Sequence, residues 1–211
     1  MNKTKQTTFI FDKYASQYQT KYMDTSLYHN TFDLFCKSIQ QKNASILEVG
    51  CGPGNITHYL LNQCPDFQFL GIDLAPNMIA LAQENNPTAQ FEILDGRAIN
   101  KLSQKFDGIL CGFCFPYFSK TEAIKFIADA AQKLHKNGIL YISTMEGAYE
   151  KSSWQGPSSN HIDRLYIHYH QLDYLEEALL ENGFKIVSIE KKSYKNQREE
   201  QVVDLIIIAQ L

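Results

Sequence analysis

The sequence predicts one doubly wound α/β domain, whose mostly parallel seven-stranded sheet ends in an antiparallel hairpin. From Ala44 onward, short apolar runs alternate with helical patterns, as they do in parallel βαβ units. The apolar runs are nearly continuous in hydrophobic residues, which is typical of strands covered by helices on both faces of a sheet. The chain has 211 residues, 44% of them hydrophobic, and no biased segment, so we expect a single domain over residues 1–211.

The parallel part of the sheet is expected to hold five strands with helices between them. The strands are expected at 45–50, 68–73, 89–94, 106–112 and 138–144. The helices between them are expected at 55–63, 76–85 and 120–135. After a further helical pattern at Leu172–Gly183, two strand-like runs, 184–194 and 201–211, are joined by a polar turn too short for a crossover. These last two strands must therefore be antiparallel.

Two segments outside this alternation are expected to cover the site. Residues 1–40 are predicted to form a helical lid, because Tyr14, Tyr18 and Tyr22 recur every four residues and would share one face of a helix. Residues 146–170 follow the fifth strand and are predicted to form a substrate-side loop, in which Trp154 is a candidate lid residue. Ligands bind at this carboxyl end of the strands in open α/β sheets.

Charge and cysteine content limit the binding partners and the cellular compartment that we expect. The net charge of −3 provides no positive field for nucleic acid, so we expect no nucleic-acid partner. No apolar run approaches the roughly 20 residues of a membrane span, and no signal-peptide pattern opens the chain. The five cysteines form no even framework, so we expect reduced thiols, a cytoplasmic protein, and packing roles for Cys111 and Cys114 despite their C-x-x-C spacing. The expected assembly is a monomer or homodimer.

The stretch SILEVGCGPGN, at Ser45–Asn55, joins a buried strand to a helix through three alternating glycines. Glycines at such a turn permit positive φ and let a ligand approach the backbone closely. Asn55 stands where the dinucleotide fingerprint requires its third glycine, and no G-K-[ST] follows, so a phosphate ligand is disfavoured.

Two carboxylates follow the next two strands. Asp73 ends the second strand, about 20 residues beyond the first glycine, where a carboxylate can accept both ribose hydroxyls. Asp95 ends the third strand and can accept a hydrogen bond from an exocyclic amine such as that of adenine. Three strand ends therefore converge on a nucleoside.

Four motifs, ILEVGCGPGN, GIDLAPNMIALAQ, EILDGRA and FDGILCGF, resemble the successive motifs of the class I S-adenosylmethionine-dependent methyltransferases. The C-terminal hairpin and the lead-in segment FDKYASQYQTKY are similar to theirs as well, so the resemblance spans nearly the whole chain and implies a Rossmann-like methyltransferase fold. It implies S-adenosylmethionine as cofactor and S-adenosylhomocysteine as product. It further implies that the glycines pass under the methionine part, that Asp73 holds the ribose, and that Leu74 and Met78 flank the adenine. The expected cofactor-binding set is Tyr18, Glu48, Gly50, Cys51, Gly52, Gly54, Asn55, Asp73, Leu74, Met78, Asp95, Gly96, Arg97 and Cys111.

The acceptor side is expected to be aromatic. The run GFCFPYF after the fourth strand does not match the Asn/Asp-Pro-Pro-Tyr motif of nucleic-acid amino methylases. The expected substrate-binding residues are Tyr14, Tyr22, Phe113, Phe115, Tyr117 and Trp154. His168 and His170 alternate in an extended segment and are candidate general bases. We expect no metal site, because only His161 is near enough in sequence to add a third ligand.

These features favour methyl transfer, by in-line displacement, to a small-molecule acceptor at oxygen, nitrogen or carbon. One alternative is a protein, carrier-protein or tRNA methyltransferase that docks its substrate through the basic segment Lys191–Arg198. The other is a module that binds S-adenosylmethionine without transferring methyl. The motifs define the cofactor site rather than the substrate, so they leave the acceptor open.

Overall fold

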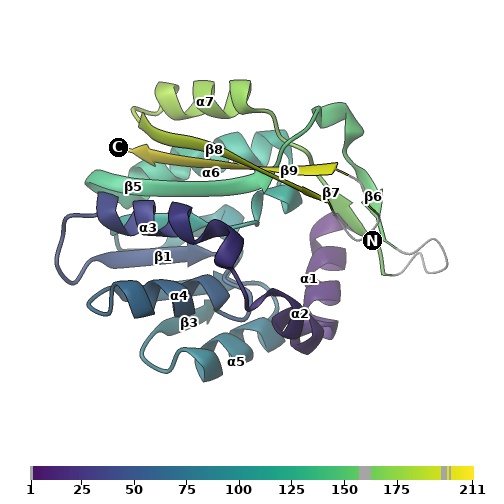
Figure 1. The fold of residues 1–211 in the computed structure, drawn as a ribbon, viewed down its shortest axis with the longest axis horizontal. Coiled ribbons are helices and arrows are strands. Elements are labelled where there is room, and N and C mark those ends of the chain that lie inside the picture. The colour runs from purple at the N-terminus through teal and green to yellow at the C-terminus, as the bar shows by residue number, and fades with distance from the viewer. Residues whose placement is uncertain (1, 157–162, 196–198, 200) are drawn as a thin grey trace.

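The computed structural model describes residues 2–156, 163–195, 199 and 201–211, and its centre is a seven-stranded sheet in the order β3-β2-β1-β4-β5-β9-β8 (Figure 1). Strands β1 to β5 are mutually parallel, whereas β9 runs antiparallel to β5 and β8 antiparallel to β9. The strand bounds are β1 Ser45–Val49, β2 Gln68–Asp73, β3 Gln90–Ile93, β4 Phe106–Cys111, β5 Leu134–Met145, β8 Lys185–Lys195 and β9 Gln201–Gln210. This arrangement confirms the predicted fold class, including the terminal hairpin.

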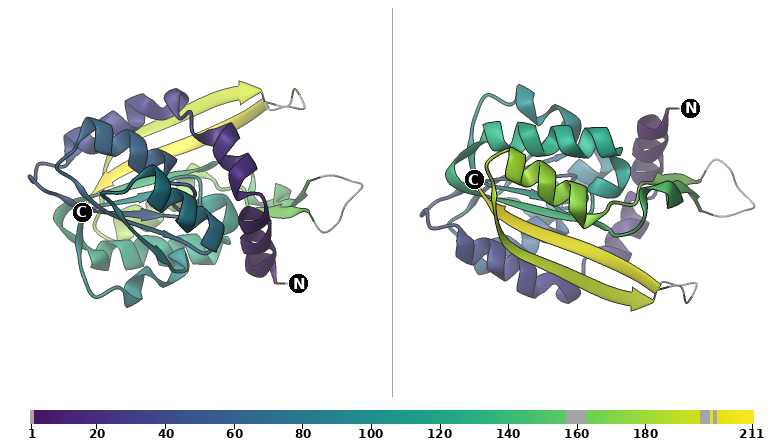
Figure 2. Two further views of the ribbon diagram at one scale, coloured as in Figure 1. Left: turned by 90° about the horizontal axis from the view of Figure 1, so that it is seen from below. Right: turned by 90° about the horizontal axis from the view of Figure 1, so that it is seen from above.

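Helices cover both faces of the sheet (Figure 2). One face carries α3, α4 and α5, and the other carries α6 and α7. The helix bounds are α3 His29–Ser38, α4 Asn55–Gln63, α5 Pro76–Asn85, α6 Lys120–Lys133 and α7 Leu172–Glu181. Because both faces are covered, β1 is buried along its length, with Ile46 packed toward α3 and α4 and Leu47 toward α6 and α7.

The boundary between α6 and β5 differs from the predicted one. The helix ends at Lys133 rather than at residue 135, and β5 begins at Leu134 rather than at residue 138. Leu134 pairs with Phe106 of β4, and the register then shifts before the pairing of Gly108 with Ile139. The polar residues His135 to Gly138 therefore belong to an irregular start of the strand and not to a loop.

The N-terminal segment is two helices and not one, which corrects the interpretation of the three tyrosines as a single face. Helix α1 spans Lys3–Lys13, helix α2 spans Ala15–Tyr22, and the chain bends at Tyr14, whose φ and ψ are −109° and 21°. The bend buries Ala15 against Ala75 and Met78 beside α5. Tyr18 and Tyr22 still share a face, but Tyr14 does not.

The segment predicted as a substrate-side loop is partly ordered into a small second sheet. Its strands are β6 Ser153–Gln155 and β7 Leu165–Ile167, which pair antiparallel beside α1 (Figure 1). Residues 157–162, including His161, lie outside the described residues. Among the helices that the structure describes, none is long and apolar enough to cross a membrane.

Candidate functional site

A pocket with about 760 Å³ of empty space, part of it open to solvent, lies at the carboxyl edge of the parallel strands. Its walls come from the ends of β1, β2 and β4, from the segment after β3, and from α1 and α2. The predicted residues that line it are Tyr18, Gly50, Gly52, Asp73, Leu74, Met78, Asp95, Gly96, Arg97, Phe113 and Tyr117. The pocket thus brings together residues from four separate motifs.

The three glycines of the loop after β1 all have positive φ, between 53° and 76°. A Cβ atom on Gly50 would lie 2.9 Å from Cys114 Cβ, and one on Gly54 would lie 2.4 Å from Asn86 Nδ2. A Cβ atom on Gly52 would meet only Tyr18 Cε1, at 3.8 Å across the pocket. Gly50 and Gly54 are therefore needed for packing, whereas Gly52 offers bare backbone to a ligand.

The Asp73 carboxylate is fixed in the pocket wall by backbone amides. Its Oδ2 accepts from the Gly52 N–H at 3.1 Å, and its Oδ1 accepts from the Ala75 N–H at 2.9 Å. Burial raises the pKa of Asp73, and these amide bonds act in the opposite direction. Each carboxylate oxygen keeps acceptor capacity, so the group can bind two further hydroxyls.

Asp95 and Arg97 form a fork-to-fork ion pair at the other end of the pocket. Arg97 Nε lies 2.8 Å from Asp95 Oδ1, and Nη2 lies 2.9 Å from Oδ2. Arg97 also contacts Thr4 Oγ1 at 2.6 Å and Glu122 Oε1 at 3.3 Å. The Thr4 contact ties α1 to this end of the pocket, and Asp95 Oδ2 keeps room for one more donor. A Cβ atom on Gly96 would lie 2.5 Å from Val49, so this glycine is needed for close packing.

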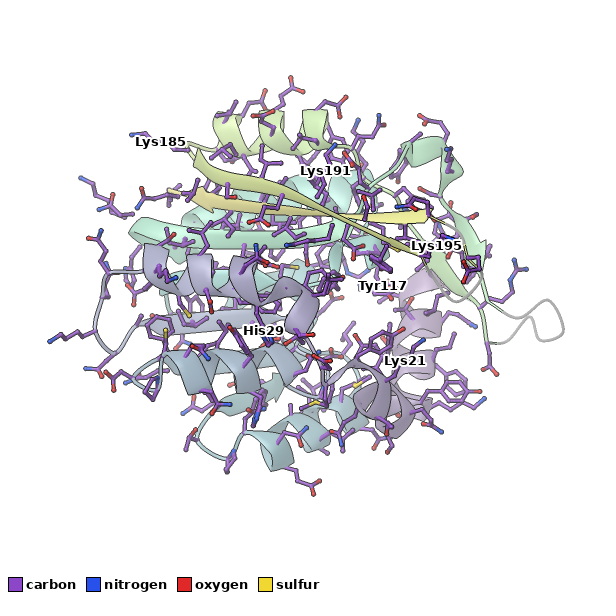
Figure 3. All side chains as sticks on the ribbon, viewed as in Figure 1. Lys21, His29, Tyr117, Lys185, Lys191 and Lys195 are labelled. Carbon is purple, nitrogen blue, oxygen red and sulfur yellow. The ribbon has the colours of Figure 1, made fainter. Side chains whose placement is uncertain are left out.

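Aromatic rings from two elements close the middle of the pocket. Phe11 of α1 packs edge-on against Tyr18 at 5.6 Å and against Tyr117 at 5.2 Å between ring centroids. Figure 3 shows Tyr117 between the N-terminal helices and the C-terminal hairpin. Burial raises the pKa of both tyrosines, which keeps them neutral. Phe11 and the threonines of α1 were not predicted, because TKQTTFIF carries no spacing that marks a ligand site.

Five residues of the predicted cofactor set do not line the pocket: Glu48, Cys51, Gly54, Asn55 and Cys111. Glu48 is buried in β1 and accepts a hydrogen bond from Thr57, and burial raises its pKa to about 8. Asn55 donates through Nδ2 to the Tyr22 carbonyl at 2.8 Å. These residues support the loop from behind or, through Asn55, tie it to α2.

The predicted substrate-binding residues are scattered. Phe113 and Tyr117 line the pocket, and Tyr22 packs on Tyr18 with ring centroids 4.6 Å apart. The other three lie elsewhere. The Tyr14 hydroxyl donates to Asp163 at 2.8 Å, Phe115 is buried in the core, and Trp154 lies on β6 against Tyr166.

Neither candidate histidine lines the pocket. The Nε2–H of His170 donates to the Phe115 carbonyl at 2.9 Å, and its Nδ1 accepts from the Tyr174 hydroxyl. Burial lowers the pKa of His170 to about 4, so it is neutral near pH 7 and both nitrogens are engaged. His168 stacks on Tyr149 at 5.7 Å, and burial lowers its pKa. Among the described residues, no group of three side chains could hold a metal ion.

The pocket fits a sulfonium nucleoside better than a nucleotide. Two carboxylates face it, and the guanidinium of Arg97, which also lines it, is already paired with two carboxylates. Apolar side chains lie between the two carboxylates, namely Leu74, Met78 and Leu94. This lining suits a flat base between the apolar side chains and a ribose on Asp73. It also suits a cationic sulfur near the tyrosine rings.

Comparison with known proteins agrees with this chemistry. A family model described as a methyltransferase domain matches residues 46–138. The chain is 34% identical to a malonyl-[acyl-carrier protein] O-methyltransferase of Acetivibrio thermocellus over 136 residues, which are 64% of this chain and 44% of that protein. It is 35% identical to a trans-aconitate 2-methyltransferase of Methylobacterium nodulans over 68 residues, which are 32% of this chain and 26% of that protein. The chain thus spans about half the length, or less, of the curated relatives it matches.

Solved structures share the whole fold. Magnesium protoporphyrin IX methyltransferase from Synechocystis PCC 6803, solved with S-adenosylmethionine bound, covers 100% of this chain and 97% of its own, with a TM-score of 0.70 and 15% identity. A methyltransferase from Methanosarcina mazei covers 83% of this chain and 95% of its own, with a TM-score of 0.69 and 18% identity. Residues 46–138 therefore match a methyltransferase domain, and the chain has the fold of S-adenosylmethionine-dependent methyltransferases.

Proposed function

We propose that this protein binds S-adenosylmethionine and transfers its methyl group to a small-molecule acceptor. The observation that carries the proposal is the meeting of the bare Gly52 backbone and the amide-held Asp73 carboxylate in one pocket. The named activities of the relatives support methyl transfer to small molecules or carrier-bound acids.

Each end of the pocket has its own task in this proposal. Asp73 accepts the two ribose hydroxyls, Leu74 and Met78 pack against the adenine, and Asp95 accepts from its exocyclic amine. The loop at Gly50 and Gly52 passes under the methionine part. When bound, S-adenosylmethionine supplies a methyl group on a positively charged sulfur.

The protein accelerates transfer chiefly by alignment. Displacement at the methyl carbon requires the acceptor atom about 3 Å away and opposite the sulfur, and such positioning can supply roughly 7–11 kcal/mol. Phe11 and Tyr18 belong to the N-terminal lid and lie over the pocket, where they exclude water. Tyr18 and Tyr117 present rings to the sulfonium.

Thermal unfolding with ligands tests the proposal. S-adenosylmethionine or S-adenosylhomocysteine at about 100 times its dissociation constant should add roughly 2.7 kcal/mol, or on the order of 5–10 °C, whereas NAD should add nothing. Asp73→Ala should abolish the rise, and Asp66→Ala, which changes an exposed carboxylate, should keep it. A rise with NAD alone, or no rise with either sulfur compound, refutes the proposal.

Docking of a carrier protein or tRNA through Lys191–Arg198 has less support. Lys191 pairs with Glu146 at 2.7 Å, and Lys195 pairs with Glu199 at 2.9 Å. Residues 196–198 lie outside the described residues. Ion pairing partly neutralises the described lysines of this segment, which weakens it as a docking surface.

A further inference from the structure

A buried carboxylate, Asp204, lies beside the pocket and takes no part in holding the methyl donor. It is 1% exposed on β9, opposite Met145, the last residue of β5. It therefore belongs to the same edge of the sheet as the pocket. The Tyr28 hydroxyl donates to Asp204 Oδ2 at 2.5 Å, and the Tyr194 hydroxyl also bonds to this carboxylate.

One ring contact joins this carboxylate to the pocket wall, and a second lies beside it. The Tyr28 ring lies 4.6 Å from the ring of Phe113, which lines the pocket. Tyr22 lies 4.6 Å from Tyr18, which lines it as well. Phe113 has a φ of 57°, an unusual conformation for a bulky residue, and its N–H donates to Ser143 Oγ at 2.8 Å. The strained backbone thus holds the Phe113 ring in the pocket wall, where it contacts Tyr28, the residue that donates to the carboxylate.

We call Tyr22, Tyr28, Phe113, Tyr194 and Asp204 the tyrosine–carboxylate cluster. Within the described part of the chain, no cation pairs with Asp204. The lysines around the cluster, some labelled in Figure 3, have other partners: Lys191 pairs with Glu146, Lys192 with Glu190, Lys195 with Glu199, and Lys21 lies 4.8 Å above the Tyr22 ring.

The Lys21 contact shows that a ring of the cluster already attracts an ammonium group. A carboxylate without a cation, bounded by aromatic rings, is the chemistry that recognises an organic cation. Burial raises the pKa of Asp204, as expected of a carboxyl that has hydroxyl donors but no ion pair. Asp204 thus has two hydroxyl donors and no cation among the described residues, and its oxygens keep acceptor capacity for a positively charged donor.

We propose that the methyl acceptor is an amine, which enters as an ammonium ion and is held by Asp204 and Tyr28 against the rings of the cluster. This inference rests on the proposed function and names its substrate class. The ammonium gives one proton to the Asp204 carboxylate through the Tyr28 hydroxyl. The freed lone pair on nitrogen then forms the N–C bond while the S–C bond breaks and its electron pair returns to sulfur, leaving a methylated ammonium and a neutral thioether.

An amine acceptor differs from the acidic acceptors for which the curated relatives are named. Malonyl and trans-aconitate acceptors carry carboxylates, which would face the negative charge of Asp204 here. Like charges in a poorly solvated site repel strongly. The cluster thus favours amines and opposes acids.

Isothermal titration calorimetry on the protein saturated with S-adenosylhomocysteine tests this inference. The probes are benzylammonium, benzoate and benzyl alcohol, which share a ring and differ in charge. Benzylammonium should bind at least about tenfold more tightly than either other probe. Asp204→Asn and Tyr28→Phe should each remove this preference while S-adenosylhomocysteine still binds as in the wild type. Tyr194→Phe removes one hydroxyl donor of Asp204 and should weaken the preference for benzylammonium. Because the Tyr194 ring is exposed, this variant should fold as the wild type does.

The outcomes separate the two proposals. Failure to bind S-adenosylhomocysteine appears before any probe is added and refutes the proposed function. If S-adenosylhomocysteine binds but benzoate or benzyl alcohol binds as well as benzylammonium, or none of the three binds, the amine inference is wrong. If Asp204→Asn or Tyr28→Phe no longer binds S-adenosylhomocysteine, the test passes to Tyr194→Phe. An unchanged preference for benzylammonium in Tyr194→Phe then overturns the inference.

Discussion

The half of the pocket at the ends of β1 to β3 is positioned by backbone turns that each follow their own strand, whereas the half near α1, α2 and the β8–β9 hairpin is assembled from side chains of distant segments. In the first half, Gly52 and the amides that hold Asp73 come from a short stretch of adjoining turns. Beside the second half, Tyr28 and Asp204, which share a hydrogen bond, are 176 residues apart in sequence. The first half should therefore be sensitive to added atoms, and the second to lost functional groups.

The largest effect should come from adding one methyl group to the first half. Gly54→Ala requires a φ of 76° and places Cβ 2.4 Å from Asn86 Nδ2 and 3.3 Å from Ala82. We expect a loss of about 3 kcal/mol in the free energy of unfolding, measured by urea titration.

Gly52→Ala is the matched control for this change. Its φ of 53° carries a similar backbone strain, but its Cβ would make only an ordinary contact, with Tyr18 Cε1 at 3.8 Å. We expect a loss of about 1 kcal/mol in the free energy of unfolding. We also expect S-adenosylhomocysteine to bind at least about tenfold more weakly, because the added methyl group enters the pocket. Equal stability of the two variants would show that the loop does not divide into packing and binding glycines.

The next effect concerns Glu48, which lies behind the same loop. Its folded pKa of about 8 exceeds the ordinary value of 4.5, so the folded state binds the proton more tightly. Stability conferred by this proton is present below pH 4.5 and is lost as pH rises toward 8. We expect unfolding free energy to fall by about 2 kcal/mol between pH 6 and pH 9 in the wild type. In Glu48→Gln, which keeps an acceptor for Thr57, most of that slope should vanish, and a slope as steep as the wild type's would place its origin elsewhere.

A smaller effect is expected from the side-chain half that covers the donor. Phe11→Ala removes the ring that contacts Tyr18 and Tyr117, and we expect S-adenosylhomocysteine to bind about tenfold more weakly, or about 1.4 kcal/mol. Phe9→Ala on the same helix removes an exposed ring outside this pocket and should change affinity less than twofold. Similar losses in both variants would mean that α1 acts through helix stability and not through the pocket.

The backbone half could be predicted from sequence because its signals are local. Glycines after β1 and carboxylates after β2 and β3 each follow their own strand, and parallel strands bring their carboxyl ends to one edge. Glu48 shows the limit of this reasoning, since it belongs to the motif but is buried behind the loop with Thr57.

The side-chain half could not be predicted because it depends on pairing between distant segments. The bend at Tyr14 has no glycine or proline to mark it, and it removes that tyrosine from the face shared by Tyr18 and Tyr22. Asp204 did leave a signal, since a carboxylate that interrupts VVDLIII must find partners when buried. Only the pairing of β9 with β5 shows that those partners lie at the pocket edge.

The smallest effect tests whether the acceptor site includes His168. His168 lies between Tyr149 and Tyr166, its lowered pKa keeps it neutral near pH 7, and its backbone N–H donates to the Pro116 carbonyl at 2.8 Å. His168→Gln keeps that backbone bond, so we expect less than about a threefold change in benzylammonium affinity, or about 0.7 kcal/mol, against a loss of about tenfold in Asp204→Asn. A loss in His168→Gln as large as in Asp204→Asn would extend the acceptor site to β7 and restore the histidine to the role that its sequence pattern first indicated. A small loss leaves the cluster around Asp204 as the group that holds the ammonium ion.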